Sequence, residues 1–274
     1  MNKQLLIDEY AKTFGDEIRE LASYLVPCIT LRCDADSPSS PSSSDDRNVI
    51  TQMSFADTVT EMQRTFGCKL GGLPDLAADL EYPLDNKGRP MLFIGQVDFA
   101  ALPTVDEVPP CSSADTLYWF INADLNLANQ KDRHRFRVIR AKDSMAKFPS
   151  GSDLSPLGPT RYLEPVASLC LSRLAVVQSE VQRDLALRLN QMCALRLFGE
   201  LESFADEARE IAAFATNGIS WSLARRADSC YEHLVAAAVD WRLLWLVPSH
   251  LSDALLPSLA LMIRSADLAS GALE

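Results

Sequence analysis

Residues 69–98, KLGGLPDLAADLEYPLDNKGRPMLFIGQVD, constrain the fold of this chain more than any other stretch. Gly71 and Gly72 can adopt positive φ angles and Pro74 ends regular structure, so residues 69–74 are predicted to form a fixed loop. Residues 80–90 form a polar connection rich in turn-forming residues. Residues 91–97 are an apolar run of strand length with one polar side chain, Gln96, and they predict a buried strand.

The same stretch contains four submotifs, which are Lys69-Leu70-Gly71-Gly72-Leu73-Pro74, Tyr82-Pro83, Gly88-Arg89-Pro90 and Phe93-Ile94-Gly95-Gln96-Val97-Asp98. In this order and spacing they resemble the signature of the YwqG-like family, bacterial proteins of uncharacterised biochemistry. The resemblance implies a single domain over residues 1–274 with a second, similar pair of strands. It also implies an association with toxin neighbourhoods.

Composition and cysteine usage predict a soluble cytoplasmic protein. The chain has 274 residues, of which 47% are hydrophobic and 23% charged, ordinary values for a globular protein. Its seven cysteines are odd in number and never form a Cys-x-x-Cys pair, which predicts neither a disulfide framework nor a zinc site. No apolar run approaches the roughly 20 residues that span a bilayer, so no membrane partner is expected.

The net charge of −11 indicates what the chain can bind. It results from 26 Lys and Arg against 37 Asp and Glu. Binding to nucleic acid needs clustered positive charge, so we expect no nucleic-acid partner. A basic protein partner would be favoured. The alternative is that the acidity serves only to keep the protein soluble.

The pattern along the chain predicts an α+β fold with a duplicated, largely antiparallel β core, an N-terminal amphipathic helix and an inserted helical segment. The duplication is predicted because residues 241–247 resemble 91–97 and residues 259–268 resemble 117–125. Leu246 replaces the Gln expected from the family pattern. The predicted segments are an N-terminal helix and strand at 1–30, a flexible acidic Ser/Pro loop at 34–46, a first β half at 66–145, a helical insertion at 160–215 and a second β half at 235–274.

Catalytic signatures are not found in the sequence. His134, His233 and His250 lack metal-ligand spacing, and no nucleophile elbow or phosphate-binding loop occurs. The carboxylates of residues 202–210 fit a polar helix face. We therefore expect no enzyme activity, no catalytic residue, no metal and no cofactor. A hydrolase with a diffuse carboxylate site is the less favoured alternative.

Polar residues beside the apolar strand need partners once they are buried, because an unpaired group costs roughly 1 to 3 kcal/mol. Gln96 and Asp98 are expected to bond the backbone of the glycine loop. Lys69 could bind an anion, or it could pair with Asp98 or Glu81. The family-motif positions with a structural or ligand-binding role are Lys69, Gly71, Gly72, Pro74, Gln96 and Asp98.

The favoured function is that of an immunity or antitoxin protein in interbacterial competition. It would bind a basic cognate toxin, such as a secreted nuclease effector delivered by type VI secretion, and block its active site. The alternative is a small-ligand-binding module with a pocket between the two halves, formed by Lys69, Gln96 and Asp98. The predicted partner-binding residues are Asp75, Asp79, Glu81, Tyr82 and Asp85.

Overall fold

The fold is built on one nine-stranded sheet with the order β11-β10-β9-β1-β8-β2-β4-β5-β6, in which each pair of neighbours is antiparallel. We analysed a computed structural model that describes residues 1–33, 67–77, 79–108, 115–122, 136–142, 146–147, 160–172, 179–201, 205–249 and 258–270. The sheet and its helices confirm the predicted α+β class with a largely antiparallel core. The predicted loop at 34–46 lies outside the described residues.

The strands of the large sheet are β1 (Leu25–Cys33), β2 (Cys68–Leu70), β4 (Leu92–Asp98), β5 (Asp115–Ile121), β6 (Phe136–Lys142), β8 (Arg161–Leu171), β9 (Arg196–Leu197), β10 (Trp241–Val247) and β11 (Leu259–Arg264). A second sheet pairs β3 (Leu76–Ala77) with β7 (Ala146–Lys147). The centre of the large sheet is the ladder of β1 and β8, which runs from Leu25 opposite Leu171 to Cys33 opposite Leu163.

Strand β8 corrects the predicted helical insertion at 160–215, because residues 161–171 are extended. The odd-numbered residues from Leu163 to Leu171 are all apolar, an alternation that fits the period of a strand and not that of a helix. The same residues pair with β1. Among the described strands, β2 pairs with β8 only at Arg161–Leu163, so Pro165 lies beyond that short pairing.

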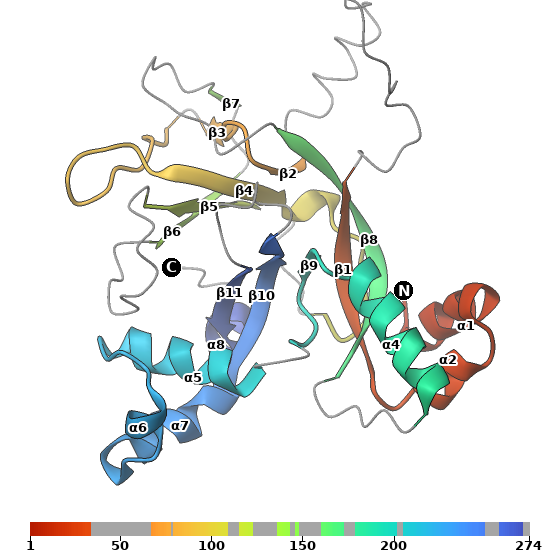
Figure 1. Ribbon diagram of the computed structural model, residues 1–274. Helices are drawn as coiled ribbons and strands as arrows, with labels where there is room; N and C mark the ends of the chain where they lie inside the picture. The colour runs from red at the N-terminus through yellow and green to blue at the C-terminus, as the bar shows by residue number, and fades with distance from the viewer. Residues whose placement is uncertain are drawn as a thin grey trace, which may run out of the picture.

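The helices lie beside the sheet in two groups (Figure 1). Helices α1, α2 and α4 are near the β1 and β8 ladder, and α5, α6 and α7 are near β10 and β11. The remaining elements are α1 (Lys3–Phe14), α2 (Glu17–Glu20), η2 (Phe99–Ala101), α4 (Glu180–Met192), α5 (Ala205–Thr216), α6 (Leu223–Arg226), η4 (Ser229–Tyr231), α7 (Glu232–Ala237), η5 (Ala238–Asp240) and α8 (Ser265–Ser270). Within the described part of the chain, no helix is long and apolar enough to cross a membrane.

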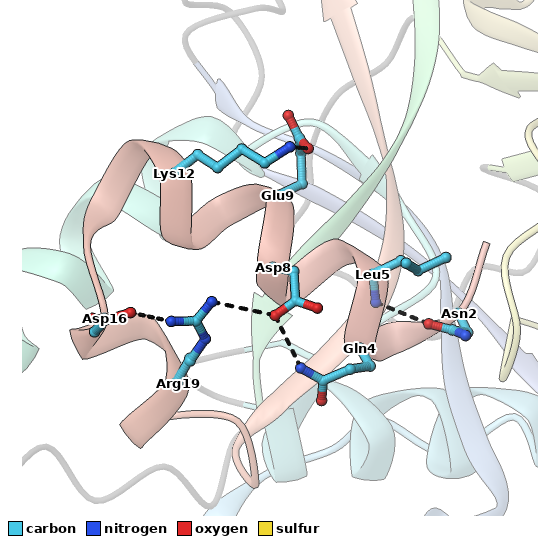
Figure 2. A network of polar contacts seen from close by, with 8 residues as sticks. All are labelled: Asn2, Gln4, Leu5, Asp8, Glu9, Lys12, Asp16 and Arg19. Atoms are coloured by element: carbon cyan, nitrogen blue, oxygen red, sulfur yellow. Dashed lines mark hydrogen bonds and ion pairs between the residues drawn. The ribbon is translucent and has the colours of Figure 1, made fainter.

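The N-terminal helix predicted within residues 1–30 is divided into two helices in the structure. Helix α1 begins after Asn2, whose side chain accepts a hydrogen bond from the Leu5 N–H, and it ends at Gly15, which has a φ of 81°. The shorter α2 follows, and β1 already begins at Leu25. Arg19 of α2 pairs with Asp8 of α1 and with Asp16 between the helices, so one guanidinium joins both (Figure 2).

The same backbone turn occurs at the end of β2 and at the end of β9. Gly71 and Gly72 both have a φ of 63°, and Phe198 and Gly199 have φ angles of 60° and 77°. The Gly71 N–H donates to the Ile94 carbonyl at 2.9 Å, and the Phe198 N–H donates to the Leu244 carbonyl at 3.1 Å. Each short strand therefore ends in the same left-handed turn, anchored to the neighbouring long strand.

A second repeated feature is an irregularity in each hairpin. The register of β4 against β5 shifts between Phe93 and Gly95, and that of β10 against β11 shifts between Leu243 and Trp245. Outward from the central ladder, β8 is followed by β2, β4 and β5, and β1 by β9, β10 and β11. The two sides of the sheet thus repeat strand order and local geometry.

Candidate functional site

The candidate site surrounds Lys69, the middle residue of β2, which lies opposite Gln96 of β4. The Lys69 Nζ is 2.7 Å from Asp75 Oδ1, and the two side chains are 6% and 5% exposed. Lys69 therefore pairs with Asp75, which corrects the predicted pairing with Asp98 or Glu81. A buried ion pair needs further hydrogen bonds to offset the loss of hydration.

Gln96 and Tyr118 supply these hydrogen bonds to Asp75. The Gln96 amide donates to Asp75 Oδ2 at 2.9 Å and to the Gly67 carbonyl at 3.1 Å, and its oxygen accepts from the Asp75 N–H at 2.9 Å. The Tyr118 hydroxyl donates to the Asp75 carbonyl at 2.6 Å. We call Lys69, Asp75, Gln96 and Tyr118 the buried clamp. Gln96 therefore bonds the backbone at Gly67 and Asp75, on either side of the glycine loop, and not within residues 69–74 as predicted.

The glycine loop brings Asp75 back over β2. The two positive φ angles reverse the chain after Leu70, and the space at Gly72 is already occupied, because a Cβ there would lie 1.9 Å from Thr160 Oγ1. Pro74, directly before Asp75, is buried. The family-motif residues Gly71, Gly72 and Pro74 therefore have a structural role, which is to shape the turn that leads to Asp75.

Burial disfavours both charges of the ion pair. Desolvation lowers the pKa of Lys69, while the Asp75 charge opposes this shift. Desolvation also raises the pKa of Asp75, and Lys69 and Gln96 oppose that shift. Each charge is thus held in place by its partner. This arrangement suits a structural clamp better than a proton-transfer site open to substrate.

Beyond the clamp, the chain forms a loop whose turn is fixed by Asp85. The Asp85 Oδ1 accepts the N–H groups of Lys87 and Arg89 at 2.8 and 2.9 Å, and Oδ2 accepts the Arg89 guanidinium at 2.7 Å. At the base of the loop, Met91 N–H donates to the Pro83 carbonyl at 3.0 Å. The loop over residues 79–90 therefore has defined backbone geometry, and we call it the acidic loop. It extends beyond the start of β4 (Figure 1).

The predicted partner-binding residues have different positions. Asp75 and Asp85 are buried and form internal hydrogen bonds. Their role is therefore structural, and the predicted partner-binding role is wrong for both. Asp79 and Glu81 are exposed. Tyr82 is half-buried, and its ring meets Phe120 edge-on at 5.6 Å. The prediction was wrong because a carboxylate in a loop is expected to be exposed to solvent unless its tertiary partner is known.

Asp98 lies apart from the clamp. Its side chain accepts the Ala100 N–H at 2.9 Å and begins the η2 turn. Tyr118 was not predicted as a clamp residue, although a hydroxyl within an apolar strand, beside Trp119 and Phe120, was a usable signal. Tyr118 is directly opposite Gln96 in the β4 and β5 pairing, a register that only the fold reveals.

No group of three or more His, Cys, Asp or Glu in the described ranges could hold a metal ion. Of the three histidines, only His233 lies in these ranges, and it is exposed on α7.

Residues 68–233 match the model of a domain of unknown function, DUF1963. The match starts at the first residue of β2 and includes the clamp and the acidic loop. No curated protein matches the chain.

Proposed function

We propose that this chain, which belongs to the DUF1963 family, binds a protein partner through its acidic loop and acts as an immunity or antitoxin protein. The partner would be a basic bacterial toxin in the same cytoplasm. Binding would occlude the active site of the toxin, and no catalysis by this chain is needed. The resemblance of the four submotifs to the YwqG-like family supports the toxin-related role.

The observation that carries this proposal is an apolar side chain displayed on a fixed loop. Leu84 is 55% exposed, while its neighbour Asp85 is buried in the hydrogen bonds of the turn. Glu81 and Asn86 on either side are exposed. A loop already held in one conformation loses little entropy on binding, and for this reason rigid scaffolds present recognition residues on such loops.

The buried clamp explains how the loop is held. Asp75 lies between the glycine turn and the acidic loop, and it is fixed by Lys69, Gln96 and Tyr118. The clamp thus fixes the chain shortly before the loop begins. The proposed contact residues are now Asp79, Glu81, Tyr82, Leu84 and Asn86, without Asp75 and Asp85.

The net charge of −11 would steer a basic toxin toward the protein. Such steering raises association rates roughly 10- to 1,000-fold at low salt. A stable interface buries about 1,600 Å², so the acidic loop would form only the centre of the contact. Leu84 would enter an apolar pocket of the toxin, with the carboxylates at the rim.

The duplicated core forms part of the proposal. The repeated left-handed turns, the two hairpin irregularities and the matching strand order support it. In the second half, Leu246 and Ala260 stand where the first half has Gln96 and Tyr118. The shared backbone geometry is therefore compatible with apolar residues at these positions, which supports a dedicated role for the clamp in the first half.

The test uses the tagged full-length chain as bait in lysate of its native bacterium, followed by titration calorimetry with the purified captured protein. We expect a toxin-like protein with a Kd near or below nanomolar, about −12 kcal/mol. Leu84→Asp should weaken this binding at least tenfold and abolish growth protection on co-expression. The matched control, Leu223→Asp, changes an apolar residue that is 71% exposed on α6 and should retain both. Equal affinity of the Leu84 variant would refute the loop contact.

The alternative small-ligand function has one observation in its favour. The indole N–H groups of Trp119 and Trp245, where the two sides of the sheet meet, lack an acceptor among the described residues. Both side chains are, however, nearly inaccessible to solvent, so a ligand would have to open this contact. A rise in melting temperature with a metabolite, lost in Trp119→Phe, would support this function.

A further inference from the structure

Three cysteines from different elements meet on one face of the central ladder. Cys28 belongs to β1, Cys170 belongs to β8, and Cys193 follows the last residue of α4. All three are buried and form one cluster. Cys28 lies directly opposite Ser168 in the ladder, and the Ser168 hydroxyl contacts the Cys193 sulfur. We call Cys28, Cys170 and Cys193 the thiol cluster.

Polar groups surround the sulfur of Cys193. The Ser168 hydroxyl lies 3.2 Å from Cys193 Sγ, and the Tyr10 hydroxyl lies 2.6 Å from Ser168 Oγ. In its protonated form, the Cys193 thiol donates to the Leu169 carbonyl at 3.1 Å. A sulfur in this setting has hydrogen-bond donors that can stabilise a negative charge.

The strand register decides which two cysteines can be joined. Cys28 lies opposite Ser168, and Cys170 lies opposite Val26, so Cys28 and Cys170 are diagonal neighbours. Diagonal Cα atoms are about 7–8 Å apart in antiparallel sheets, whereas a disulfide needs about 4.4–6.8 Å. Cys193 lies outside the ladder and is free of this constraint. The geometry therefore favours Cys28 with Cys193.

The chemistry of the two thiols is complementary. A hydrogen bond from Cys28, with a further one from Ser168, lowers the pKa of Cys193 to about 6. Hydrogen bonds to Cys170 and Cys193, together with burial, raise the pKa of Cys28 well above its ordinary value. The lowered pKa favours Cys193 as the nucleophile, with Cys28 as the thiol beside it.

We propose that Cys193 and Cys28 are a peroxide-oxidised pair that forms an intramolecular disulfide. The Cys193 thiolate attacks a hydroperoxide, the O–O bond breaks, and the sulfur becomes a sulfenic acid as hydroxide or alkoxide leaves. Cys28 then attacks this sulfur, the S–O bond breaks, and water is released as the S–S bond forms. The two thiols together lose two electrons, which the peroxide accepts.

The oxidant reaches the cluster through the end of α4. Met192, the last residue of α4 and directly before Cys193, is 42% exposed, whereas the Cys193 side chain is buried. Opening of the last helical turn would admit a small peroxide without unfolding the sheet. The disulfide would then fasten the end of α4 to β1. This modification site is independent of the partner-binding proposal.

The experiment treats the folded protein with hydrogen peroxide, blocks free thiols and maps disulfides by mass spectrometry without reduction. The expected result is a loss of about 2 Da and a peptide pair that joins Cys28 to Cys193. Cys170→Ser and Cys68→Ser, which remove other buried thiols, should retain this pair, and Cys193→Ser should lose it.

The disulfide map of the unsubstituted protein tests the proposal even if a variant fails to fold. The proposal is overturned if Cys28 and Cys193 remain thiols under peroxide that oxidises the exposed Cys230. It is equally overturned if Cys28 pairs with Cys170 in the unsubstituted chain. Reduction with dithiothreitol should restore the original mass, and a stable mass would contradict a disulfide.

Discussion

Trp119 of β5 and Trp245 of β10 pack against each other with ring centroids 5.7 Å apart, although five strands separate β5 from β10 in the sheet order. Such a contact requires the sheet to curl until its two sides meet. Both rings are buried in the main apolar core. Gly95 lies beneath them, because a Cβ at this position would be 2.7 Å from the Trp245 ring.

Gly95→Ala should therefore destabilise the protein by about 1–3 kcal/mol, the usual range for forcing extra volume into a packed core. The added methyl group would also lie 2.6 Å from the Lys69 carbonyl oxygen, so neighbouring strands would have to shift. Urea unfolding measures the change. The control is Gly88→Ala, where no atom lies within 4 Å and only the φ of 74° causes strain. A smaller loss at Gly95 than at Gly88 would contradict the close packing.

Lys69→Met should cost about 3–5 kcal/mol, because it leaves the Asp75 carboxylate buried without its cation. The double variant Lys69→Met/Asp75→Asn removes both charges and should recover much of this loss. A double-mutant cycle by urea unfolding at neutral pH measures the coupling. Additive losses from the two single changes would show that the 2.7 Å contact contributes no coupling.

The acidic loop should lose order in acid through Asp85. Desolvation opposes the charge, but the hydrogen bonds from the backbone and side chain of Arg89 and from Lys87 prevail and lower the pKa of Asp85. A lowered folded pKa contributes stability above the unfolded pKa of about 3.9, and this contribution disappears as the pH falls through the folded value.

We therefore expect the N–H signals of Lys87 and Arg89 to lose their hydrogen-bonded shifts below about pH 4. NMR titration measures this change. In Asp85→Asn these signals should be insensitive to pH over the same interval. If both proteins titrate alike, another group controls the loop.

Asn2→Ala should destabilise the chain by about 1 kcal/mol, a typical value for loss of a helix N-cap. The Asn2 side-chain oxygen accepts the Leu5 N–H at 2.9 Å (Figure 2). Asn2→Asp keeps an acceptor at the same position and should retain the stability. Thermal unfolding compares the three proteins, and equal losses in both variants would exclude a capping role.

Much of the sheet could be predicted from local pattern. The apolar runs at 91–97 and 241–247 correspond to β4 (Leu92–Asp98) and β10 (Trp241–Val247), because such short runs between turn residues have few other stable forms. Gly71 and Gly72 were predicted to allow positive φ in a fixed loop, and both have positive φ. The segment 161–171 was predicted wrongly because its alternating apolar residues were grouped with the helical pattern that follows, which forms α4 (Glu180–Met192).

The candidate site was predicted only in part. Lys69 and Gln96 were identified because polar residues beside an apolar strand need partners. Their actual partner, Asp75, was assigned to the surface, as was Asp85. A carboxylate is buried or exposed according to the cation that the fold places beside it, and this information is not local.

The sequence by itself determined the positions of β1, β4, β5, β10 and the glycine turn, since hydrophobic period and the special φ range of glycine act over a few residues. Only the tertiary structure decided that residues 161–171 extend along β1, that Lys69 pairs with Asp75, and that three cysteines meet. These outcomes depend on contacts between residues far apart in the chain. The free energies of these contacts exceed the local conformational preferences of the chain only after the sheet has assembled.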